Sequence, residues 1–334
     1  MLTKQKRDSK PKTKLVAKSV PALRMLYATQ FDHTIHTLMR VLSPRSRSMM
    51  CRRFGLFGLE PHTLDAIGQQ EGLTRERIRQ IEDASVLAMH KSKEYQALKP
   101  EFAALEKLML RYGGVLSVAF MESAEVFGSV AAKQAGTFLL RMSPFARHYY
   151  ANPKFTERWY HKGTDHGAIE KALLAFAKPV KASGRAYPER EFFGDMAKFI
   201  KPVGAISKPA LLGYFKIARE LVKNGYGEFG HYTSHVARPW GMRDEAYVVL
   251  MKAGRPLHYT EIVGRIVSAR GRTARVSTVH NCLVSDERFA LVGRGMYALI
   301  EWGYRNVYKH HPVTAGSGKK RRMRRTWKNV VHPS

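Results

Sequence analysis

The chain has 334 residues, of which 44% are hydrophobic, and it carries a formal net charge of +30 with an isoelectric point near 10.3. That length allows several small domains, and the hydrophobic content is typical of a folded globular protein. So large an excess of lysine and arginine predicts a polyanionic partner, with no small-molecule substrate indicated. Nucleic acid is favoured over an anionic membrane because no amphipathic anchor stands out. A merely basic soluble protein, such as a ribosome-associated factor, is the alternative.

The sequence contains two cysteines, Cys51 and Cys282, in widely separated segments. They exclude a disulfide framework and a metal site of the CxxC type. Neither a signal-type apolar core nor an apolar run long enough for a membrane helix occurs. We therefore expect a cytoplasmic, nucleoid-associated protein with no membrane partner.

Both ends of the chain are strongly basic. We expect residues 1–20 to form a disordered basic arm, and residues 21–40 to form a helix that packs as core. Residues 309–334 are expected to form a disordered tail that reaches DNA phosphates or a minor groove, although a solvated solubility tail is the alternative. The phosphate-binding candidates of this tail are Lys319, Lys320, Arg321, Arg322, Arg324 and Arg325.

The pattern that decides the functional prediction lies within residues 21–98. Thr63 is a typical N-cap for a helix that ends near Gln70, and Gly72 can adopt the left-handed conformation that stops a helix. Thr74 then caps a second helix. Its apolar positions fall three or four residues apart, at Ile78, Ile81, Ala84 and Ala88. Its opposite face carries Arg75, Glu76, Arg79 and Gln80. Two helices joined by a tight turn, with a polar stripe at the start of the second, predict a helix-turn-helix that reads a major groove.

This segment resembles region 4 of the bacterial primary sigma factors. VLSPRSRSMMCRRFGL (Val41 to Leu56) is similar to a helix of that region, and TLDAIGQQEGLTRERIRQIE (Thr63 to Glu82) follows it nearly residue for residue. The resemblance implies that the module reads a –35 promoter element of the TTGACA type and docks on the β flap of RNA polymerase. It implies base reading by Arg75, Glu76, Arg79 and Gln80. The candidates for the DNA backbone in this module are Thr63, Thr74 and Arg77.

This chain departs from the sigma family in two respects, and both limit the functions that the resemblance implies. The family continues its second helix with a basic run, where this chain has Asp83 to His90, so several phosphate-binding positions are neutral. The sigma regions that recognise and melt the –10 element have no counterpart in the sequence. A sigma factor that opens promoters unaided is therefore not expected.

Residues 99–163 are interpreted as a winged helix. The stretch from Glu101 to Ser117 should form a helix that is ended by Gly113-Gly114. A second helix should lie around Ala119 to Val126, and a third should run from Val130 to Phe145. Two β-prone segments joined by a turn follow. Three helices followed by a hairpin is the winged-helix order.

Residues 164–240 are expected to repeat this arrangement, or to form another helical module. The expected helices are Gly167 to Ala177, Glu189 to Ile200 and Ser207 to Lys223. A basic loop with Lys178, Lys181 and Arg185 should separate the first two.

Residues 241–308 give the clearest winged-helix pattern. Met242 to Val267 predicts two helices around a Gly-Arg-Pro break, the second capped by Thr260, and Arg275 to Phe289 supplies a third. Apolar residues then alternate on both sides of a Gly293-Arg294-Gly295 turn, which predicts a hairpin. GRPLHYTEI…TVHNCLVSDERFALVGRGMYAL resembles the HARE-type winged helix, as found in the delta subunit of bacterial RNA polymerase. The resemblance implies contact with polymerase or DNA in transcription or chromatin, with Arg294 in the wing.

Several patterns suggest enzyme chemistry but are better explained otherwise. GYGEFG (Gly225 to Gly230) has the spacing of a dinucleotide-binding loop, yet it follows a helix, and no helix opens after it, so a hairpin or loop is favoured. His231 and His235 have the spacing of metal ligands but lie in a β-prone segment. Nuclease chemistry needs clustered carboxylates, which are scarce here. We therefore predict no catalytic residues, no metal and no cofactor.

The sequence as a whole predicts a mainly α protein of tandem helix-turn-helix and winged-helix modules with small β-hairpin wings. Its predicted function is sequence-specific binding of double-stranded DNA in transcription, with RNA polymerase as a second partner. Two alternatives stay open: a polymerase-binding modulator without its own DNA specificity, and an architectural nucleoid-type protein. RNA binding is a weaker option, because the basic segments show no aromatic stacking platform.

Overall fold

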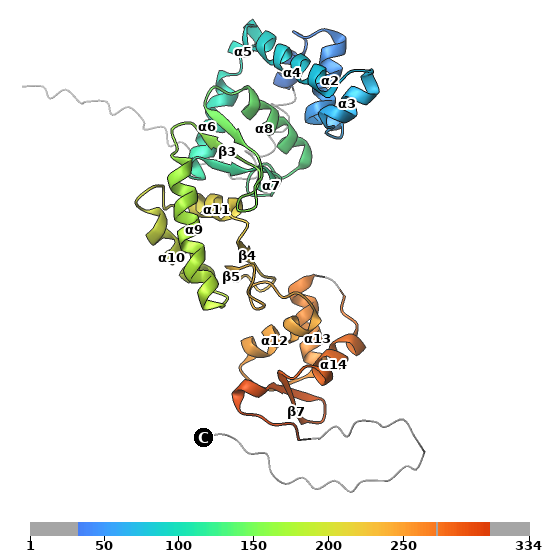
Figure 1. Ribbon diagram of the computed structural model, residues 1–334, viewed down its shortest axis with the longest axis vertical. Coiled ribbons are helices and arrows are strands. Elements are labelled where there is room, and N and C mark those ends of the chain that lie inside the picture. Colours follow the sequence, from blue (N-terminus) through green and yellow to red (C-terminus); the bar gives the residue numbers. More distant parts are fainter. Residues whose placement is uncertain (1–32, 272, 308–334) are drawn as a thin grey trace, which may run out of the picture. The chain divides into compact units, whose positions relative to one another are not determined.

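A computed structural model of the chain describes residues 33–271 and 273–307 (Figure 1). The described part is mainly helical with small antiparallel sheets, which confirms the predicted fold class. It divides into two compact units, one built from residues 33–165 and 212–217, the other from residues 166–211, 218–271 and 273–307. The expected basic arm at residues 1–20 and the tail at 309–334 lie outside the described residues.

Unit 1 begins with the helix-turn-helix. Residues 33–39 are helical. The elements that follow are α2 (Pro44–Phe54), the short 3-10 helix η1 (Leu56–Gly58), α3 (Leu64–Glu71), α4 (Arg75–His90) and α5 (Lys93–Gln96). Gly55 ends α2 in the left-handed conformation, with φ of 66°.

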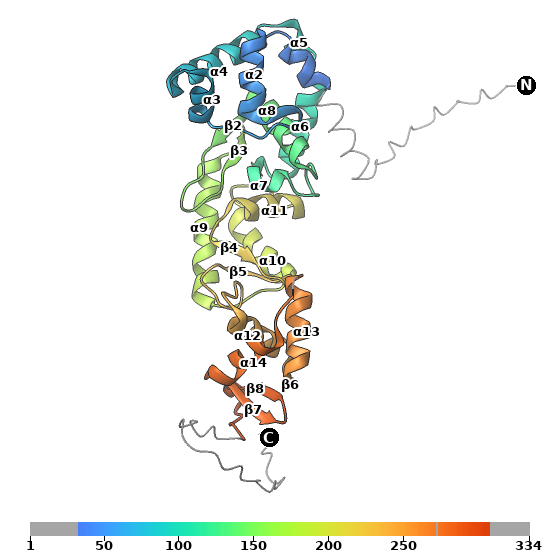
Figure 2. The ribbon, with the colours of Figure 1, turned by 90° about the vertical axis from the view of Figure 1, so that its right-hand side faces the viewer.

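The rest of unit 1 has the element order of a winged helix. It consists of α6 (Lys99–Arg111), β1 (Val115–Ser117), α7 (Val118–Met121), α8 (Val130–Met142), β2 (Ala146–Tyr149) and β3 (Arg158–His161). Figure 2 shows β2 and β3 side by side, and the antiparallel sheet has the order β1-β3-β2. The helix expected at residues 119–126 is shorter than predicted, because it ends at Met121 and turns follow.

Residues 166–231 repeat this order. They form α9 (His166–Ser183), α10 (Glu189–Ile200), α11 (Lys208–Ile217), β4 (Leu221–Lys223) and β5 (Phe229–His231). Tyr187, between α9 and α10, makes an isolated β-bridge to Phe229, in the place that β1 takes in the first winged helix. The GYGEFG stretch spans the β4–β5 turn and β5, as the hairpin interpretation predicted.

Two predictions in this segment were wrong. Lys178 and Lys181 lie in α9 rather than in a loop, because the helix continues through Pro179. Ala177 and Val180 on either side of that proline are buried, so packing outweighs the lost backbone hydrogen bond. The third expected helix ends at Ile217, and its predicted last residues, 221–223, form β4.

A third winged helix ends the described chain. Its elements are α12 (Met242–Ala253), β6 (Leu257–His258), α13 (Tyr259–Arg270), α14 (Val276–Ser285), β7 (Phe289–Gly293), β8 (Met296–Leu299) and the 3-10 helix η2 (Ile300–Trp302). The sheet order β6-β8-β7 is again the same, and the hairpin predicted at Gly293-Arg294-Gly295 is confirmed. The cap of α13 is His258 rather than Thr260, since the His258 side chain accepts from the Thr260 backbone N–H.

The apolar cores define how these modules are held together. In unit 1 one core joins the helix-turn-helix to the first winged helix, with Leu38 and Met89 on one side and Phe138 and Trp159 on the other. It therefore runs across residue 98, where the sequence had suggested a domain boundary. The third winged helix has its own core around Leu250, Ile262, Val279 and Leu299.

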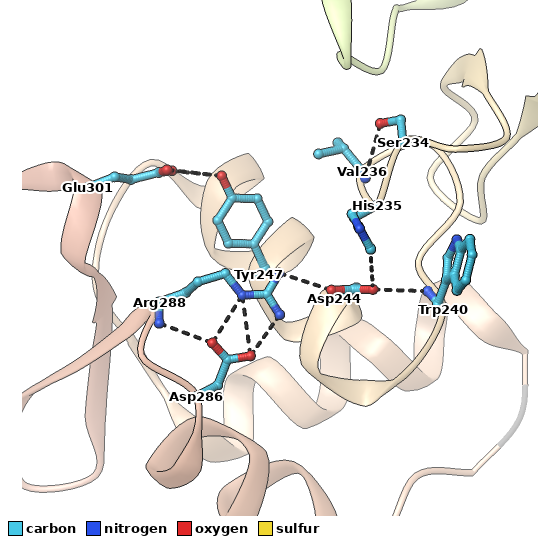
Figure 3. Close-up of polar contacts among 9 residues, drawn as sticks. All are labelled: Ser234, His235, Val236, Trp240, Asp244, Tyr247, Asp286, Arg288 and Glu301. Atoms are coloured by element: carbon cyan, nitrogen blue, oxygen red, sulfur yellow. Dashed lines mark hydrogen bonds and ion pairs between the residues drawn. The ribbon is translucent and has the colours of Figure 1, made fainter. Parts of the chain in front are cut away.

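A polar network in unit 2 fastens the segment before α12 to the third winged helix (Figure 3). Asp244 accepts hydrogen bonds from the Trp240 backbone N–H at 3.2 Å and from His235 Nδ1 at 3.1 Å, and its other oxygen lies 2.9 Å from Arg288 Nη1. Arg288 also pairs with Asp286 at 2.7 Å. Nearby, the Tyr247 hydroxyl donates to Glu301 at 3.0 Å.

Candidate nucleic-acid interface

The turn between α3 and α4 is set by local capping. The Thr63 hydroxyl accepts from the Ala66 backbone N–H and caps α3, and the Thr74 hydroxyl accepts from the Arg77 N–H and caps α4. Gly72 lies between them with φ of 66°, and its N–H donates to the Gly68 carbonyl. A residue with a Cβ is strained in that conformation. All three predictions about this turn are therefore confirmed.

Close packing fixes the angle between the two helices. A Cβ added at Gly68 would lie 2.6 Å from the Leu73 carbonyl oxygen, so only glycine lets the turn come this near α3. Met49 of α2, Ile67 of α3 and Ile78 of α4 form a small buried cluster beneath the turn. The polar face of α4 is consequently held outward by three helices.

Ion pairs connect α2 to both α3 and α4. Arg52 and Arg45 both pair with Glu71 at the end of α3, and these contacts, led by the hydrogen bond from Arg52, lower the pKa of that carboxyl. Arg53 pairs with Glu82 of α4 at 3.1 Å. The three arginines thus keep α2 in register with both helices.

The inward face of α4 differs from the prediction. Ala84 and Ala88 are exposed, and the buried positions are Ile78, Glu82, Ser85 and Met89. Their spacing of three and four residues is helical, but the face includes a carboxylate that the apolar pattern could not reveal. Arg53 neutralises Glu82 from α2, and Arg141 Nε of α8 approaches it at 3.9 Å.

The four base-reading candidates lie together on the exposed side of α4. Arg75, Glu76, Arg79 and Gln80 are all solvent-exposed. Arg79 donates two hydrogen bonds of 2.7 and 2.9 Å to Glu76 and one of 2.7 Å to Asp83. The hydrogen bond from Arg79 lowers the pKa of Glu76. Glu76 is therefore an anionic acceptor at neutral pH, next to the exposed guanidinium of Arg79.

The remaining candidates are distributed more widely. Arg77 is exposed and donates to Gln80 at 3.1 Å, while Thr63 and Thr74 use their hydroxyl oxygens as helix caps. Arg294 is exposed at the β7–β8 turn of unit 2. The candidates from Lys319 to Arg325 lie outside the described residues.

The third helices of the winged helices differ in how much of their surface is free. In α8, eight of thirteen residues are buried, including Gln134 and Phe138. The second half of α11 belongs to unit 1, where the Tyr214 hydroxyl donates to the Gly113 carbonyl at 3.0 Å. In α14, by contrast, Val279 and Leu283 are the buried residues of ten. Of these three helices, α14 therefore offers the most open surface to a partner.

The histidines whose spacing suggested a metal site make structural contacts instead. His231 is buried and bonds Thr233, whereas His235 bonds Asp244, so the two imidazoles have different partners. Within residues 33–271 and 273–307, no group of three or more histidine, cysteine or acidic side chains is arranged to hold a metal. In the same part of the chain, no helix combines the length and apolar character that crossing a membrane requires.

Comparison with known proteins identifies a relative for the helix-turn-helix segment. Residues 38–90 match the family model of sigma-70, region 4. The match spans α2, α3 and α4, and identifies this segment as a DNA-binding helix-turn-helix related to the transcription sigma factors. It covers a small part of the 334 residues. No solved structure matches the chain.

Sequence reasoning missed the features that depend on distant segments. Arg141, on α8, lies 3.7 Å from Asp83 and so adds a cation beside the exposed face of α4. An aromatic cluster of His148, Tyr150 and Trp159 gathers on β2, β3 and the loop between them. Neither has a local signal in the sequence, because only the packing of α8 and the hairpin brings these residues together.

Proposed function

We propose that the protein is a sequence-specific DNA-binding transcription factor whose α4 reads a –35-like promoter element. Arg75 and Arg79 donate to guanine O6 and N7 or to phosphate, and Glu76 accepts from a cytosine amine. Gln80 pairs with an adenine or thymine edge. The observation that carries the proposal is the exposed stripe on α4, within the segment that matches sigma-70 region 4.

The pairing of Glu76 with Arg79 supports base reading over simple phosphate binding. Arg79 donates to Glu76 at 2.7 and 2.9 Å in the free protein, so a donor and an acceptor for base edges already lie side by side on the exposed face of α4. Both side chains must exchange this contact for base edges. A wrong base pair would leave the carboxylate facing an acceptor, so Glu76 discriminates by repulsion as well as by attraction.

The backbone candidates and the basic ends supply affinity without specificity in this proposal. Thr63, Thr74 and Arg77 lie at the helix starts, where DNA phosphates approach a helix-turn-helix. The candidates from Lys319 to Arg325 add contacts whose strength falls as salt rises. The third winged helix, proposed to be of the HARE type, adds contacts with polymerase or DNA through the open surface of α14 and Arg294.

RNA polymerase, through its β flap, is the proposed second partner of the helix-turn-helix. Phe57 and Leu59 are 42% and 44% exposed beside the end of α2, and Phe57 adopts a left-handed φ of 58° that is unusual for a bulky residue. Two apolar side chains held outward on this module favour a protein contact. The same observation supports a second candidate function, a polymerase-binding modulator without DNA specificity.

Fluorescence anisotropy of the full chain tests base reading. A duplex carrying TTGACA is compared with the same duplex scrambled, from about 50 to about 200 mM salt. We expect a preference for TTGACA that persists at the higher salt and is lost with Glu76→Ala and with Arg79→Ala. Removing Lys319–Arg325 should instead weaken binding to both duplexes alike. Identical salt-sensitive curves for both duplexes would reject the proposal and leave two functions, the architectural protein and the polymerase-binding modulator.

Co-purification with RNA polymerase distinguishes the second candidate function, the polymerase-binding modulator, from an architectural protein. A chain that binds polymerase, but shows no TTGACA preference, would be the modulator. In that case Phe57→Ser and Leu59→Ser should abolish co-purification, whereas Arg79→Ala should leave it unchanged.

A further inference from the structure

A groove of about 770 Å³ lies within unit 1, between the helix-turn-helix and the first winged helix. Its sides are the end of α2, the exposed strip of α8 and the β2–β3 hairpin. That volume is in the range of pockets that enclose ligands of drug size. The DNA-binding stripe of α4 described above does not line it.

The arrangement of α8 makes this groove unsuitable for a duplex. Gln134 and Phe138 of α8 are buried, and the Phe138 ring lies 5.2 Å from that of Phe54 of α2. Since α2 and η1 cover this side of α8, the helix cannot enter a major groove. What stays open is a narrow strip with Lys133, Thr137 and Arg141.

The groove has an excess of positive charge. Four permanent cations line it, against the carboxylates Glu82 and Glu157; the cations are Arg53, Lys133, Arg141 and Arg147. Both carboxylates are engaged, Glu82 by Arg53 and Glu157 by His148 at 2.8 Å. Arg147 is exposed, and its guanidinium has no hydrogen-bond or ion-pair partner among the residues that the structure describes. A bound anion would therefore meet at least one uncommitted guanidinium.

An aromatic surface lies beside these cations. Tyr150 is 78% exposed, and its ring lies 4.7 Å from that of His148, which lies 4.7 Å from that of Trp159. Trp159 is 4% exposed, and its indole N–H has no acceptor within the described part of the chain. A buried donor without a partner is costly, so an acceptor from a ligand would be favoured here.

We propose that this groove binds single-stranded nucleic acid, with a base stacked on Tyr150 and phosphates held by Arg147 and Arg141. Exposed aromatic faces next to cations are the combination that binds unpaired strands, because every base has a face to stack and every nucleotide a charge. Trp159 adds a hydrogen-bond donor for a base carbonyl or a phosphate. The proposal is independent of promoter reading by α4.

Binding of labelled oligo-dT and of the matched oligo-U to the full chain tests the proposal, at about 200 mM salt to suppress non-specific attraction. Tyr150→Ala should weaken binding by about fivefold to a hundredfold, as expected for the loss of one stacked base, and Tyr150→Phe should retain it. Arg147→Gln should weaken binding and lower the salt slope by about 0.7. Tyr232→Ala, another exposed tyrosine outside the groove, is the matched control.

The two proposed nucleic-acid sites are distinguished by testing each variant on the other site's nucleic acid. Tyr150→Ala should leave TTGACA duplex binding unchanged, and Arg79→Ala should leave oligo-dT binding unchanged. The ratio of oligo-dT to oligo-U affinity identifies DNA or RNA as the preferred strand. Equal oligonucleotide affinities for Tyr150→Ala, Tyr232→Ala and the unchanged chain would overturn the proposal. So would a groove that binds an acidic phosphopeptide in preference to both oligonucleotides.

Discussion

Replacing Ile78 by alanine should open the start of the helix-turn-helix while the rest of unit 1 stays folded. Ile78 is 2% exposed and packs with Met49 and Ile67 in a small cluster separate from the main core. Truncating a buried isoleucine to alanine costs about 2–5 kcal/mol. A cluster with so few buried members has little other apolar contact to absorb that loss.

Hydrogen exchange followed by mass spectrometry measures this effect. Amides of α3 and of the first turns of α4 should exchange faster by about 30-fold to a few thousand-fold, the equivalent of that free energy. Amides of α6 and α8 should change much less, because opening is local. The matched variant is Ile266→Ala, in the core of the third winged helix, which should leave exchange in α3 unchanged.

The result also bears on DNA binding. The Ile78→Ala chain should lose its TTGACA preference although its exposed side chains are intact, because their orientation depends on the cluster. Acceleration spread evenly over α3, α6 and α8 would refute the reasoning, since it would mean that the cluster and the main core unfold together.

Three further predictions concern stability. Gly68→Ala should destabilise the chain by about 1–3 kcal/mol in urea unfolding, because the added Cβ would meet the Leu73 carbonyl oxygen. The control is Gly264→Ala, inside α13 with open space around the added Cβ. This variant should be neutral or should stabilise the chain by up to about 1 kcal/mol. Equal effects would contradict the close-approach argument. Thr74→Ala should cost about 1 kcal/mol through the lost cap, and Thr74→Ser should restore most of it; an alanine variant as stable as the parent would exclude capping as the role of this hydroxyl. The Arg288 network should make stability acid-sensitive. Burial tends to raise the pKa of Asp244, but hydrogen bonds from Arg288 and His235 outweigh burial, so this pKa is lowered. A hydrogen bond from Arg288 also lowers the pKa of Asp286. Their contribution is complete above the unfolded pKa of about 3.9 and is lost as pH falls through the lower folded values, so unfolding midpoints measured between about pH 5 and pH 2 should fall less steeply for Arg288→Gln. Parallel curves would show that the network is not the acid-sensitive element.

Local signals explain why the helix-turn-helix could be predicted from the sequence. Thr63, Thr74 and Gly72 determine helix ends through bonds to residues three or four positions away, so their role is visible in a short window. The same holds for the Gly293-Arg294-Gly295 hairpin. These elements were predicted with the correct type and nearly the correct bounds.

The errors arose where distant residues decide the outcome. Ala84 and Ala88 look apolar in the sequence, but Glu82 occupies the inward face of α4 because Arg53 of α2 neutralises it. Likewise, nothing within α8 reveals that α2 covers it. The exposed stripe on α4 could be predicted, whereas the groove beside α8 required the packing of two modules.

The shared core of unit 1 also determines how this protein can be taken apart in the laboratory. A fragment that stops at residue 98 would keep Leu38 and Met89 but lose Phe102, Leu105 and Phe138, which pack in the same core. Such a fragment would present apolar surface to water and invite aggregation. Grafting the helix-turn-helix onto another protein should therefore transfer residues 33–165 together with a replacement for the helical support that residues 212–217 of α11 give, rather than the sigma-like segment alone.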